Sequence, residues 1–272
     1  MVMRIAIVGG TGTLGRHVTD ELAGRGHETR VLSRSGAYPV DLRTGAGLAA
    51  ALDGCAAVVD ASNSQKNAAE VLVEGSRRLL AAEATAGVGH HVGVSIVGCD
   101  QVPIGYYRVK TEQEAVVTGG PVPWTIVAAT QFHELVAAAL AAAGRWHVLP
   151  VPRAQLQTVA ARDVAQVLAD VAEATPARAR LQVAGPQILT VRELALIWRE
   201  VTGTSAVLVP LPVPGRLGRA LRSGALTAGA LPAGALPAGA LTAGPAVFRG
   251  TLTFADWLAA NVPPGAGKPW AK

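Results

Sequence analysis

The sequence predicts an α/β fold built on a doubly wound parallel sheet, and three observations lead to this prediction. Short apolar runs alternate with longer amphipathic stretches through the first 150 residues. The first apolar run, 5–8, leads directly into a glycine-rich turn. A stretch with helical spacing follows that turn and ends before a second apolar run. Strands that alternate with helices in this way favour right-handed crossovers and a parallel sheet.

The first unit, residues 4–34, has the form strand, turn, helix and strand. Its opening run is Ile-Ala-Ile-Val, which is typical of a buried strand. In the stretch that follows, Leu14, Val18 and Leu22 recur four residues apart, so they lie on one face of a helix. Glycines at 24 and 26 end that helix before the second strand at 29–32.

The turn after the first strand is rich in glycine. A dinucleotide diphosphate needs backbone N–H groups within reach, no Cβ in its way and the positive end of a helix dipole. A three-glycine spacing also occurs in purely structural turns, but here it follows a strand and opens a helix within a βαβ-sized unit. We therefore predict a dinucleotide site. Its expected contacts in the turn are Gly9, Thr11, Gly12, Thr13, Leu14 and Gly15.

The end of the second strand is where such a site reads the adenosine ribose. A carboxylate there accepts a hydrogen bond from the 2′-hydroxyl of NAD, whereas a basic group accommodates the 2′-phosphate of NADP. Ser33 and Arg34 occupy this position, so the sequence favours NADP, with NAD as the alternative. A solvated strand-end arginine is the purely structural interpretation. Asp41, in a short third strand at 40–42, is expected beside the adenine or as an ordinary turn aspartate.

The later segments of the first half extend the same alternation. Ala61 and Ser62 follow the fourth strand, at the edge where open α/β sheets bind ligands, and their small side chains would let the cofactor approach. His90 and His91 precede the fifth strand without an acidic partner nearby, so we interpret them as a strand entrance and expect no metal site. We expect further strands at 56–60, 92–98 and 124–128, and helices at 48–52, 65–86 and 131–144.

Beyond residue 150 the regular alternation of strand-like and helix-like segments ends. Asp163 is expected to cap a helix, and Thr190 with Glu193 has the spacing of a capping box for another. A further strand is expected at 181–185. These elements suggest a Rossmann-type domain over residues 1–150 and a smaller substrate-binding part over residues 151–272, partly integrated with the Rossmann sheet.

Residues 224–243 repeat Gly-Ala-Leu-(Thr or Pro)-Ala four times. A five-residue period matches neither a helix nor a strand, so we expect an irregular insertion, with a lid over the substrate as the alternative. The uncharged span 223–248 is too weakly apolar for a membrane helix. A short terminal helix is expected at 254–258 and a frayed tail at 263–272.

Composition excludes several classes of partner. The net charge of +5 would permit nucleic-acid binding, but the basic residues are scattered and not gathered in one stripe. The densest group, Arg216, Arg219 and Arg222, has the spacing of a solvated helix face. Cys55 and Cys99 form no metal or disulfide motif, and no signal peptide is visible, so we expect a cytoplasmic protein.

Three polar residues, one at the end of the fifth strand and two after it, suggest chemistry. Tyr106 and Lys110 lie four residues apart and hence on one helix face. A lysine ammonium beside a phenol favours the phenolate, which makes the hydroxyl a usable acid near neutrality, and the same lysine would reach the nicotinamide ribose. Ser95, at the end of the fifth strand, would hold a substrate carbonyl oxygen. A packing role for Tyr106 is the alternative. Candidate walls of the substrate pocket are Phe132, His133, Trp146 and the segment 211–221.

Taken together, several segments resemble the atypical short-chain dehydrogenase/reductases of the NmrA-like group. The similarity covers residues 3–227 and 252–259, and the repeat at 224–243 looks like an expansion outside the family pattern. The segments are Gly-Gly-Thr-Gly-Thr-Leu-Gly-Arg at 9–16, Ser-Ile-Val-Gly at 95–98, Tyr-Tyr-Arg-Val-Lys at 106–110 and Thr-Gln-Phe-His-Glu at 130–134.

The resemblance implies a Rossmann fold that binds NAD(P) through the three glycines, with Ser95, Tyr106 and Lys110 matching the family's catalytic triad. Two functions remain open at this point. One is an NADP-preferring reductase of a small carbonyl, quinone or enone. The other is a cofactor sensor, because the group also contains members that bind the cofactor as redox-sensing regulators without turnover. A small-molecule substrate is expected in the first case, without nucleic acid or a membrane, and a homodimer is compatible with either.

Overall fold

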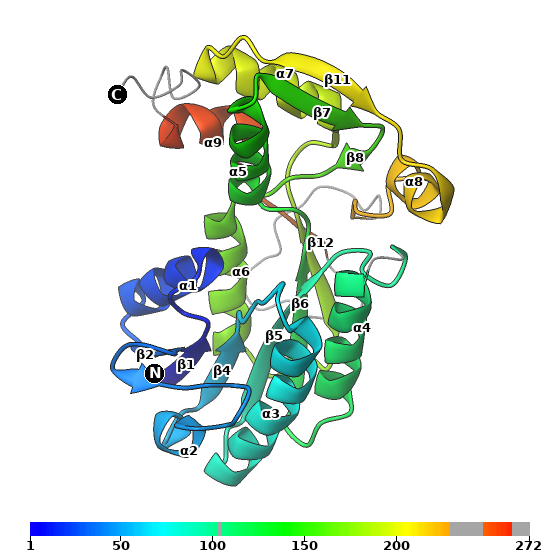
Figure 1. Ribbon diagram of the computed structural model, residues 1–272. Coiled ribbons are helices and arrows are strands. Elements are labelled where there is room, and N and C mark those ends of the chain that lie inside the picture. The colour runs from blue at the N-terminus through cyan, green and yellow to red at the C-terminus, as the bar shows by residue number, and fades with distance from the viewer. Residues whose placement is uncertain (103–104, 229–246, 263–272) are drawn as a thin grey trace.

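A computed structural model of the chain describes residues 1–102, 105–228 and 247–262 (Figure 1). Its main sheet has eight strands in the order β12-β9-β6-β5-β4-β1-β2-β3, and every neighbouring pair is parallel. The strand order reverses between β1 and β4, which is the doubly wound arrangement, so the predicted fold class is confirmed. The strands are β1 (Arg4–Val8), β2 (Glu28–Ser33), β3 (Tyr38–Pro39), β4 (Ala57–Asp60), β5 (His90–Ile96), β6 (Trp124–Ala129), β9 (Arg180–Ala184) and β12 (Val247–Arg249).

Helices cover both faces of this sheet (Figure 1). The side chains of β1 alternate between them: Ile5 and Ile7 pack under α1 and α6, whereas Ala6 and Val8 face α2 and α3. Both sets are fully or almost fully buried. The first face carries α1 (Thr13–Gly24) and α6 (Ala161–Glu173), and the second carries α2 (Leu48–Leu52), η1 (Ala69–Glu74), α3 (Gly75–Ala86) and α4 (Gly105–Thr118).

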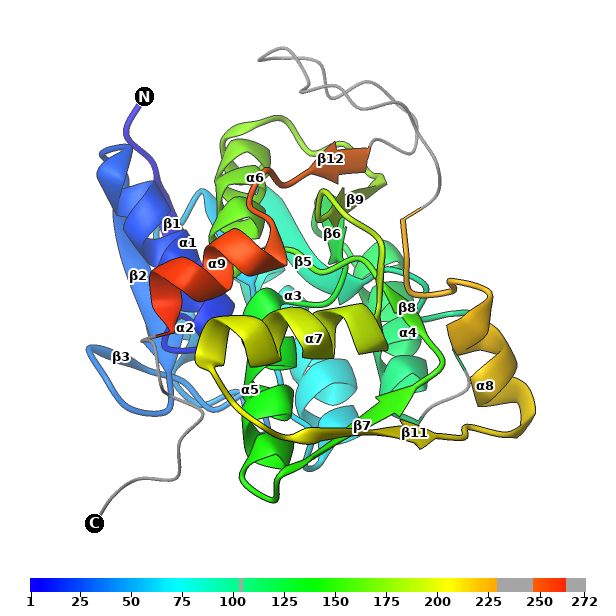
Figure 2. The same cartoon turned by 90° about the horizontal axis from the view of Figure 1, so that it is seen from above.

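A second, smaller core lies above the carboxyl ends of the strands. Leu149, Leu194, Trp198 and Phe254 are buried in it, and Figure 2 shows α7 crossing over α5 there, with α9 beside α7. Its elements are α5 (His133–Gly144), β7 (Val148–Pro152), β8 (Gln155–Leu156), β10 (Leu189–Thr190), α7 (Val191–Thr202), β11 (Val207–Leu211), α8 (Gly215–Arg222) and α9 (Phe254–Asn261). The main sheet nevertheless takes β9, β12 and the packing of α6 from beyond residue 150.

Three local expectations are wrong in detail. The third strand ends at Pro39, because Asp41 folds back in a tight turn that pairs with Ala46. The helix expected from residue 65 begins at Ala69, and its first turns are π-helical. Asp163 lies inside the first turn of α6, not at its N-cap, and its carboxylate accepts hydrogen bonds from the backbone N–H groups of residues 251 and 252. It therefore ties the segment after β12 to α6.

The two adjacent histidines also differ from expectation, because both lie within β5 and are buried. His91 has an acidic partner that the sequence reading missed: its Nδ1 lies 2.9 Å from Oε1 of Glu83 on α3. Burial opposes protonation of His91, but the Glu83 carboxylate outweighs it and raises the pKa of the imidazole. His90 bonds Thr125 instead. Among the described residues, no three His, Cys, Asp or Glu side chains form a metal-binding group.

The capping box of α7 is confirmed. Thr190 Oγ1 accepts from the backbone N–H of Glu193, and the Glu193 carboxylate accepts from the backbone N–H of Thr190 at 2.7 Å. No described helix of the chain is long and apolar enough to cross a membrane.

Loss of this cap gives a first testable prediction. We expect Thr190→Ala to lower the free energy of unfolding by about 1 kcal/mol, because an N–H group of α7 loses its acceptor. Urea denaturation followed by circular dichroism measures the change. Thr251→Ala is the matched control, since that exposed hydroxyl makes no hydrogen bond among the described residues. An equal decrease in the free energy of unfolding in both variants would contradict a stabilising role for the Thr190 cap.

Candidate active site

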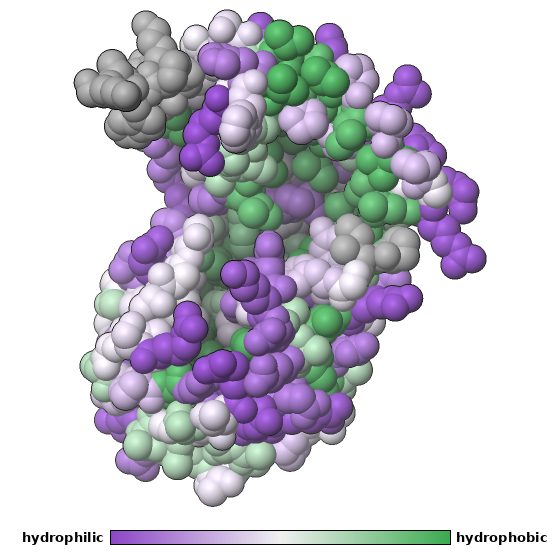
Figure 3. All heavy atoms as spheres, viewed as in Figure 1, coloured by the Kyte–Doolittle hydropathy of each residue, from purple (hydrophilic) through white to green (hydrophobic). Residues whose placement is uncertain are grey.

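A cavity of about 880 Å³ opens at the carboxyl ends of the main-sheet strands. Its lining comes from the segments after β1, β2, β4 and β6, from the end of β5, and from α4 and α5. Figure 3 shows the hollow between the sheet-bearing part and the smaller core, with apolar residues inside it. The cavity spans the point where the strand order reverses, which is where open α/β sheets bind their ligands.

The glycine turn has the shape that a diphosphate requires. Gly9 has a φ of +73°, and a Cβ there would lie 2.8 Å from the carbonyl oxygen of Ala61. A Cβ on Gly15 would lie 2.3 Å from the carbonyl oxygen of Gly9, so α1 packs against the turn only with glycine. Gly12 is the N-cap of α1 and provides no side-chain cap, which leaves the first N–H groups of the helix for a ligand.

The predicted turn residues therefore divide into two roles. Gly15 is buried behind the turn and serves the packing of the helix. The others line the cavity, namely Gly9, Thr11, Gly12, Thr13 and Leu14.

Ser33, Arg34 and Asp41 line the end of the cavity beyond β2, where the sequence predicts the adenosine. Arg34 is exposed there. Arg43, which the sequence reading missed, also lines this end, and its Nη2 donates to Asp41 Oδ2 at 2.8 Å. The side-chain and backbone hydrogen bonds from Arg43 lower the pKa of Asp41 to about 2. Asp41 is thus paired with Arg43, whereas Arg34 forms no ion pair among the described residues and only adds a smaller charge effect on the pKa of Asp41.

Tyr106 projects into the cavity from the first turn of α4. Its hydroxyl donates to Oδ1 of Asn63, in the segment after β4, at 2.6 Å. Burial, followed by the neighbouring Tyr107, raises the pKa of Tyr106. The expected lowering of this pKa by Lys110 is therefore wrong for this arrangement. A phenol with a raised pKa keeps its proton at neutral pH, as a proton donor must.

Lys110 lies one turn further along α4, at the floor of the cavity, and is 4% exposed. Its Nζ donates to the carbonyl oxygen of Val94 at 2.7 Å and to Oε1 of Gln113 at 2.5 Å. Burial lowers the pKa of this lysine. Its amine is thus turned toward the end of β5 and not hydrogen-bonded to the Tyr106 phenol.

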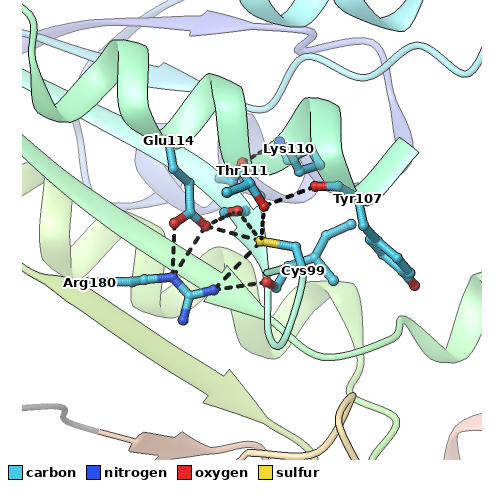
Figure 4. A network of polar contacts seen from close by, with 9 residues as sticks. Cys99, Tyr107, Lys110, Thr111, Glu114 and Arg180 are labelled. Atoms are coloured by element: carbon cyan, nitrogen blue, oxygen red, sulfur yellow. Dashed lines mark hydrogen bonds and ion pairs between the residues drawn. The ribbon is translucent and has the colours of Figure 1, made fainter. Parts of the chain in front are cut away.

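Ser95 also lines the cavity, but its hydroxyl donates to the carboxylate of Glu114. Figure 4 shows the surrounding network, in which Arg180 pairs with Glu114 at 3.1 Å and donates to the carbonyl oxygen of Ile96 at 2.9 Å. Glu114 therefore pairs with Arg180 of β9 and not with Lys110, its neighbour one turn earlier on α4. The structure brings Tyr106 to Asn63 and Ser95 to Glu114, so the three predicted catalytic side chains share one cavity without a direct hydrogen bond between them.

Comparison with known proteins decides the family. Residues 9–175 match the model of a family described as NAD(P)H-binding, which is more than half of the chain. The chain belongs to the NAD(P)H-binding family. The resemblance to the NmrA-like atypical short-chain dehydrogenase/reductases is thereby confirmed, whereas no curated protein matches the chain by sequence.

Solved structures share the fold of this NAD(P)H-binding protein. An NADPH-dependent quinone oxidoreductase from Escherichia coli, complexed with NADPH, is 21% identical with a TM-score of 0.71, over 82% of this chain and 91% of that one. A nucleoside-diphosphate-sugar epimerase from Staphylococcus aureus is 17% identical with a TM-score of 0.70, over 84% and 93%. The UDP-glucose 4-epimerase of Thermus thermophilus, complexed with NAD, is 19% identical with a TM-score of 0.66, over 77% and 86%.

Three buried polar atoms of the NAD(P)H-binding protein test whether the cavity fits such a cofactor. Ser62 Oγ, Thr130 Oγ1 and Gln131 Oε1 have no hydrogen-bond partner among the described residues, and all three side chains line the cavity. Orphaned polar atoms are rare in protein interiors, because each one costs free energy. Together with the glycine turn and the small side chain of Ala61, they fit a bound dinucleotide. Ser62 and Ala61 were predicted here, whereas the other two were noted only within a family motif.

The predicted substrate walls are only partly present. Phe132 lines the cavity. His133 does not: it is fully buried, its Nε2 donates to the carbonyl oxygen of Leu252 at 3.0 Å, and its ring lies against Phe254. At the start of α5, the side chain of His133 therefore points into the smaller core, whereas that of Phe132 points into the cavity. Trp146 is 81% exposed and lies outside the cavity lining, as does the segment 211–221.

Proposed function

We propose that this NAD(P)H-binding protein is an NADP-preferring reductase of a small carbonyl, quinone or enone, with Tyr106 as the proton donor. The observation that supports this most is the Tyr106 hydroxyl, which lies in the cavity one helical turn from a buried lysine. A bound NADPH supplies a hydride to the substrate carbon. The chain's own part is to place the substrate oxygen beside Tyr106 and to deliver the proton that completes the hydroxyl group.

The surrounding side chains support the same proposal. Asn63 holds the Tyr106 hydroxyl toward the cavity, and its amide nitrogen remains as a second donor for a substrate oxygen. Phe132 contributes an apolar wall, which suits a planar, uncharged substrate. Arg34 supports the preference for NADP, since a guanidinium without an ion-pair partner suits a 2′-phosphate.

A second candidate is a protein that senses the NADP/NADPH balance without turnover. The observation in its favour is the hydrogen bond between Ser95 and Glu114, because a hydroxyl committed to a carboxylate does not hold a substrate oxygen as the family's triad requires.

The deciding experiment is a titration of the purified protein with NADPH and NADH, followed by the absorbance of NADPH with a panel of quinones, enones and aldehydes. Tight NADPH binding with consumption of cofactor on any of them is the expected result. Tight binding without consumption across the panel would favour the sensor. The absence of binding would overturn the interpretation of the glycine turn.

A further inference from the structure

A chain of buried polar side chains lies beneath Lys110. Its Nζ donates to Oε1 of Gln113, and Nε2 of Gln113 donates to Asp60 Oδ2 at 3.3 Å and to Ser76 Oγ at 3.0 Å. Ser76 in turn donates to the same carboxylate oxygen, and the backbone N–H of Ser62 donates to Asp60 Oδ1 at 3.0 Å. The four side chains from Lys110 to Ser76 are each 4% exposed or less.

The chemistry of the end groups fixes which atom donates and which accepts along this series of hydrogen bonds. A lysine amine that faces a carbonyl donates, whereas a carboxylate only accepts. The Gln113 amide must therefore point its oxygen at Lys110 and its nitrogen at Asp60, since the flipped amide would set donor against donor at one end and acceptor against acceptor at the other. The glutamine joins a buried amine to a buried carboxylate, each through a hydrogen bond.

Asp60 is the carboxylate available to balance a charge on Lys110. Glu114 lies on the same helix, but Arg180 already pairs with it. Burial raises the pKa of the Cys99 thiol, which keeps it neutral. In contrast, Asp60 accepts hydrogen bonds only from neutral groups among the described residues.

The other titratable groups near Lys110 either have a partner of their own, face solvent or are neutral, so none of them is its counter-charge. Glu83 of α3 lies 2.9 Å from His91 of β5, so this carboxyl group already has a buried partner. Burial has the largest effect on the pKa of both groups, and the charge of Asp60 raises both by a smaller amount. Glu70 and Glu74 of η1, which packs against α4, are exposed to solvent. Tyr106 keeps its proton, because burial raises the pKa of its phenol.

We propose that Asp60 and Gln113 are positioning residues, which hold the amine of Lys110 charged and fixed at the floor of the cavity. An isolated buried ammonium costs far more free energy than one with a hydrogen-bonded counter-charge, so removal of the Asp60 charge should release the proton from Lys110. The effect on turnover rests on the proposed function. The effect on Lys110 itself does not.

The lysine content of the chain permits a direct test. It has only four lysines, Lys66, Lys110, Lys268 and Lys272. Protein labelled with ¹³C at the lysine Cε therefore gives at most four NMR signals, and the signal missing in Lys110→Met identifies Lys110. We expect this signal to report an ammonium at pH 7 in the unaltered protein. A neutral amine there would overturn the proposal by itself.

Three variants then separate charge from packing. In Asp60→Asn, we expect the pKa of Lys110 to fall by about 1 to 3 units, the usual effect of one nearby opposite charge. Ser76→Ala is the matched control, because it removes a hydrogen bond from the same network without changing its charge, and it should leave this pKa almost unchanged. The double variant Asp60→Asn/Gln113→Glu exchanges the carboxylate and the amide, and should restore the ammonium.

The outcomes are decisive even where one variant fails to fold, which circular dichroism will show. A folded double variant with an ammonium at position 110 supports the proposal, and a folded double variant with a neutral amine overturns it. Equal shifts in Asp60→Asn and Ser76→Ala also overturn it, because packing alone would then explain both.

Kinetics separate this proposal from the proposed function. If the protein reduces a substrate, activity should decline as the pH rises through the Lys110 pKa, and Asp60→Asn should move that decline to lower pH with little change in KM. An unmoved pH profile would overturn the positioning role. If no substrate is reduced at all, the proposed function fails, while the NMR titration still decides whether Asp60 holds the charge.

Discussion

Replacement of Tyr106 by phenylalanine is expected to lower kcat by about 10²- to 10⁴-fold, the range typical of a lost general acid. The change removes one hydroxyl from the cavity and leaves the aromatic ring, so the affinity for NADPH should remain almost intact. Stopped-flow absorbance of NADPH with the best substrate of the panel gives kcat, and fluorescence titration gives the affinity.

Tyr38→Phe is the matched control for this prediction. Tyr38 is a tyrosine outside the cavity lining, with its ring under the guanidinium of Arg30 at 5.0 Å. Removal of the Tyr38 hydroxyl in this variant should leave kcat unchanged. Unchanged turnover in Tyr106→Phe would remove that residue from the mechanism. A parallel loss of NADPH affinity would instead assign the hydroxyl to cofactor binding.

The sheet and the glycine turn could be predicted because their signals are local. The run at 5–8 and the spacing of Leu14, Val18 and Leu22 depend on neighbours within two helical turns, and the structure has both elements. Gly9 needs a positive φ, and Gly15 needs the space of a missing Cβ, so residue type alone indicates the turn.

The hydrogen-bond partners in the site could not be predicted in the same way. The Glu114–Arg180 ion pair joins α4 to β9 across 66 residues, and the Tyr106–Asn63 bond joins two segments 43 residues apart. Such pairs depend on strand order and on the rotation of each helix, which no local pattern records. The sequence therefore indicated Tyr106 as a chemical group but not what it touches.

Two residue spacings in the sequence nevertheless indicate partners of buried groups. Gln113 follows Lys110 by three residues, which places both on one helix face, and its amide was available to a buried amine. Glu83 precedes His91 by eight residues, within the helix that leads into the strand. His133 carried no comparable signal, because the first residues of a helix point in different directions and only the tertiary structure shows which one faces the cavity.

Arg34→Ala is expected to weaken NADPH binding by about 10- to 100-fold. A hydrogen bond to a charged group contributes about 1.5–3 kcal/mol, and its loss lowers the affinity by about this factor. NADH should be almost unaffected, because it lacks the 2′-phosphate. Fluorescence titration with both cofactors at several salt concentrations measures the difference. Arg77→Ala is the matched control: it makes the same change in net charge on α3, outside the cavity lining, where Arg77 is 60% exposed and pairs with Glu74.

The neighbouring carboxylate makes the outcome informative about the cofactor itself. Asp41 is held ionised by Arg43, and an ionised carboxylate near the ribose would repel a 2′-phosphate unless a second cation offsets it. Arg34 is a second cation at this cavity end: its charge also lowers the pKa of Asp41, but it forms no ion pair among the described residues. A preference for NADPH that disappears in Arg34→Ala therefore assigns the 2′-phosphate to this arginine. Equal losses for both cofactors would instead place Arg34 against the shared adenine or diphosphate, and would leave Asp41 as an acceptor for the ribose of NAD.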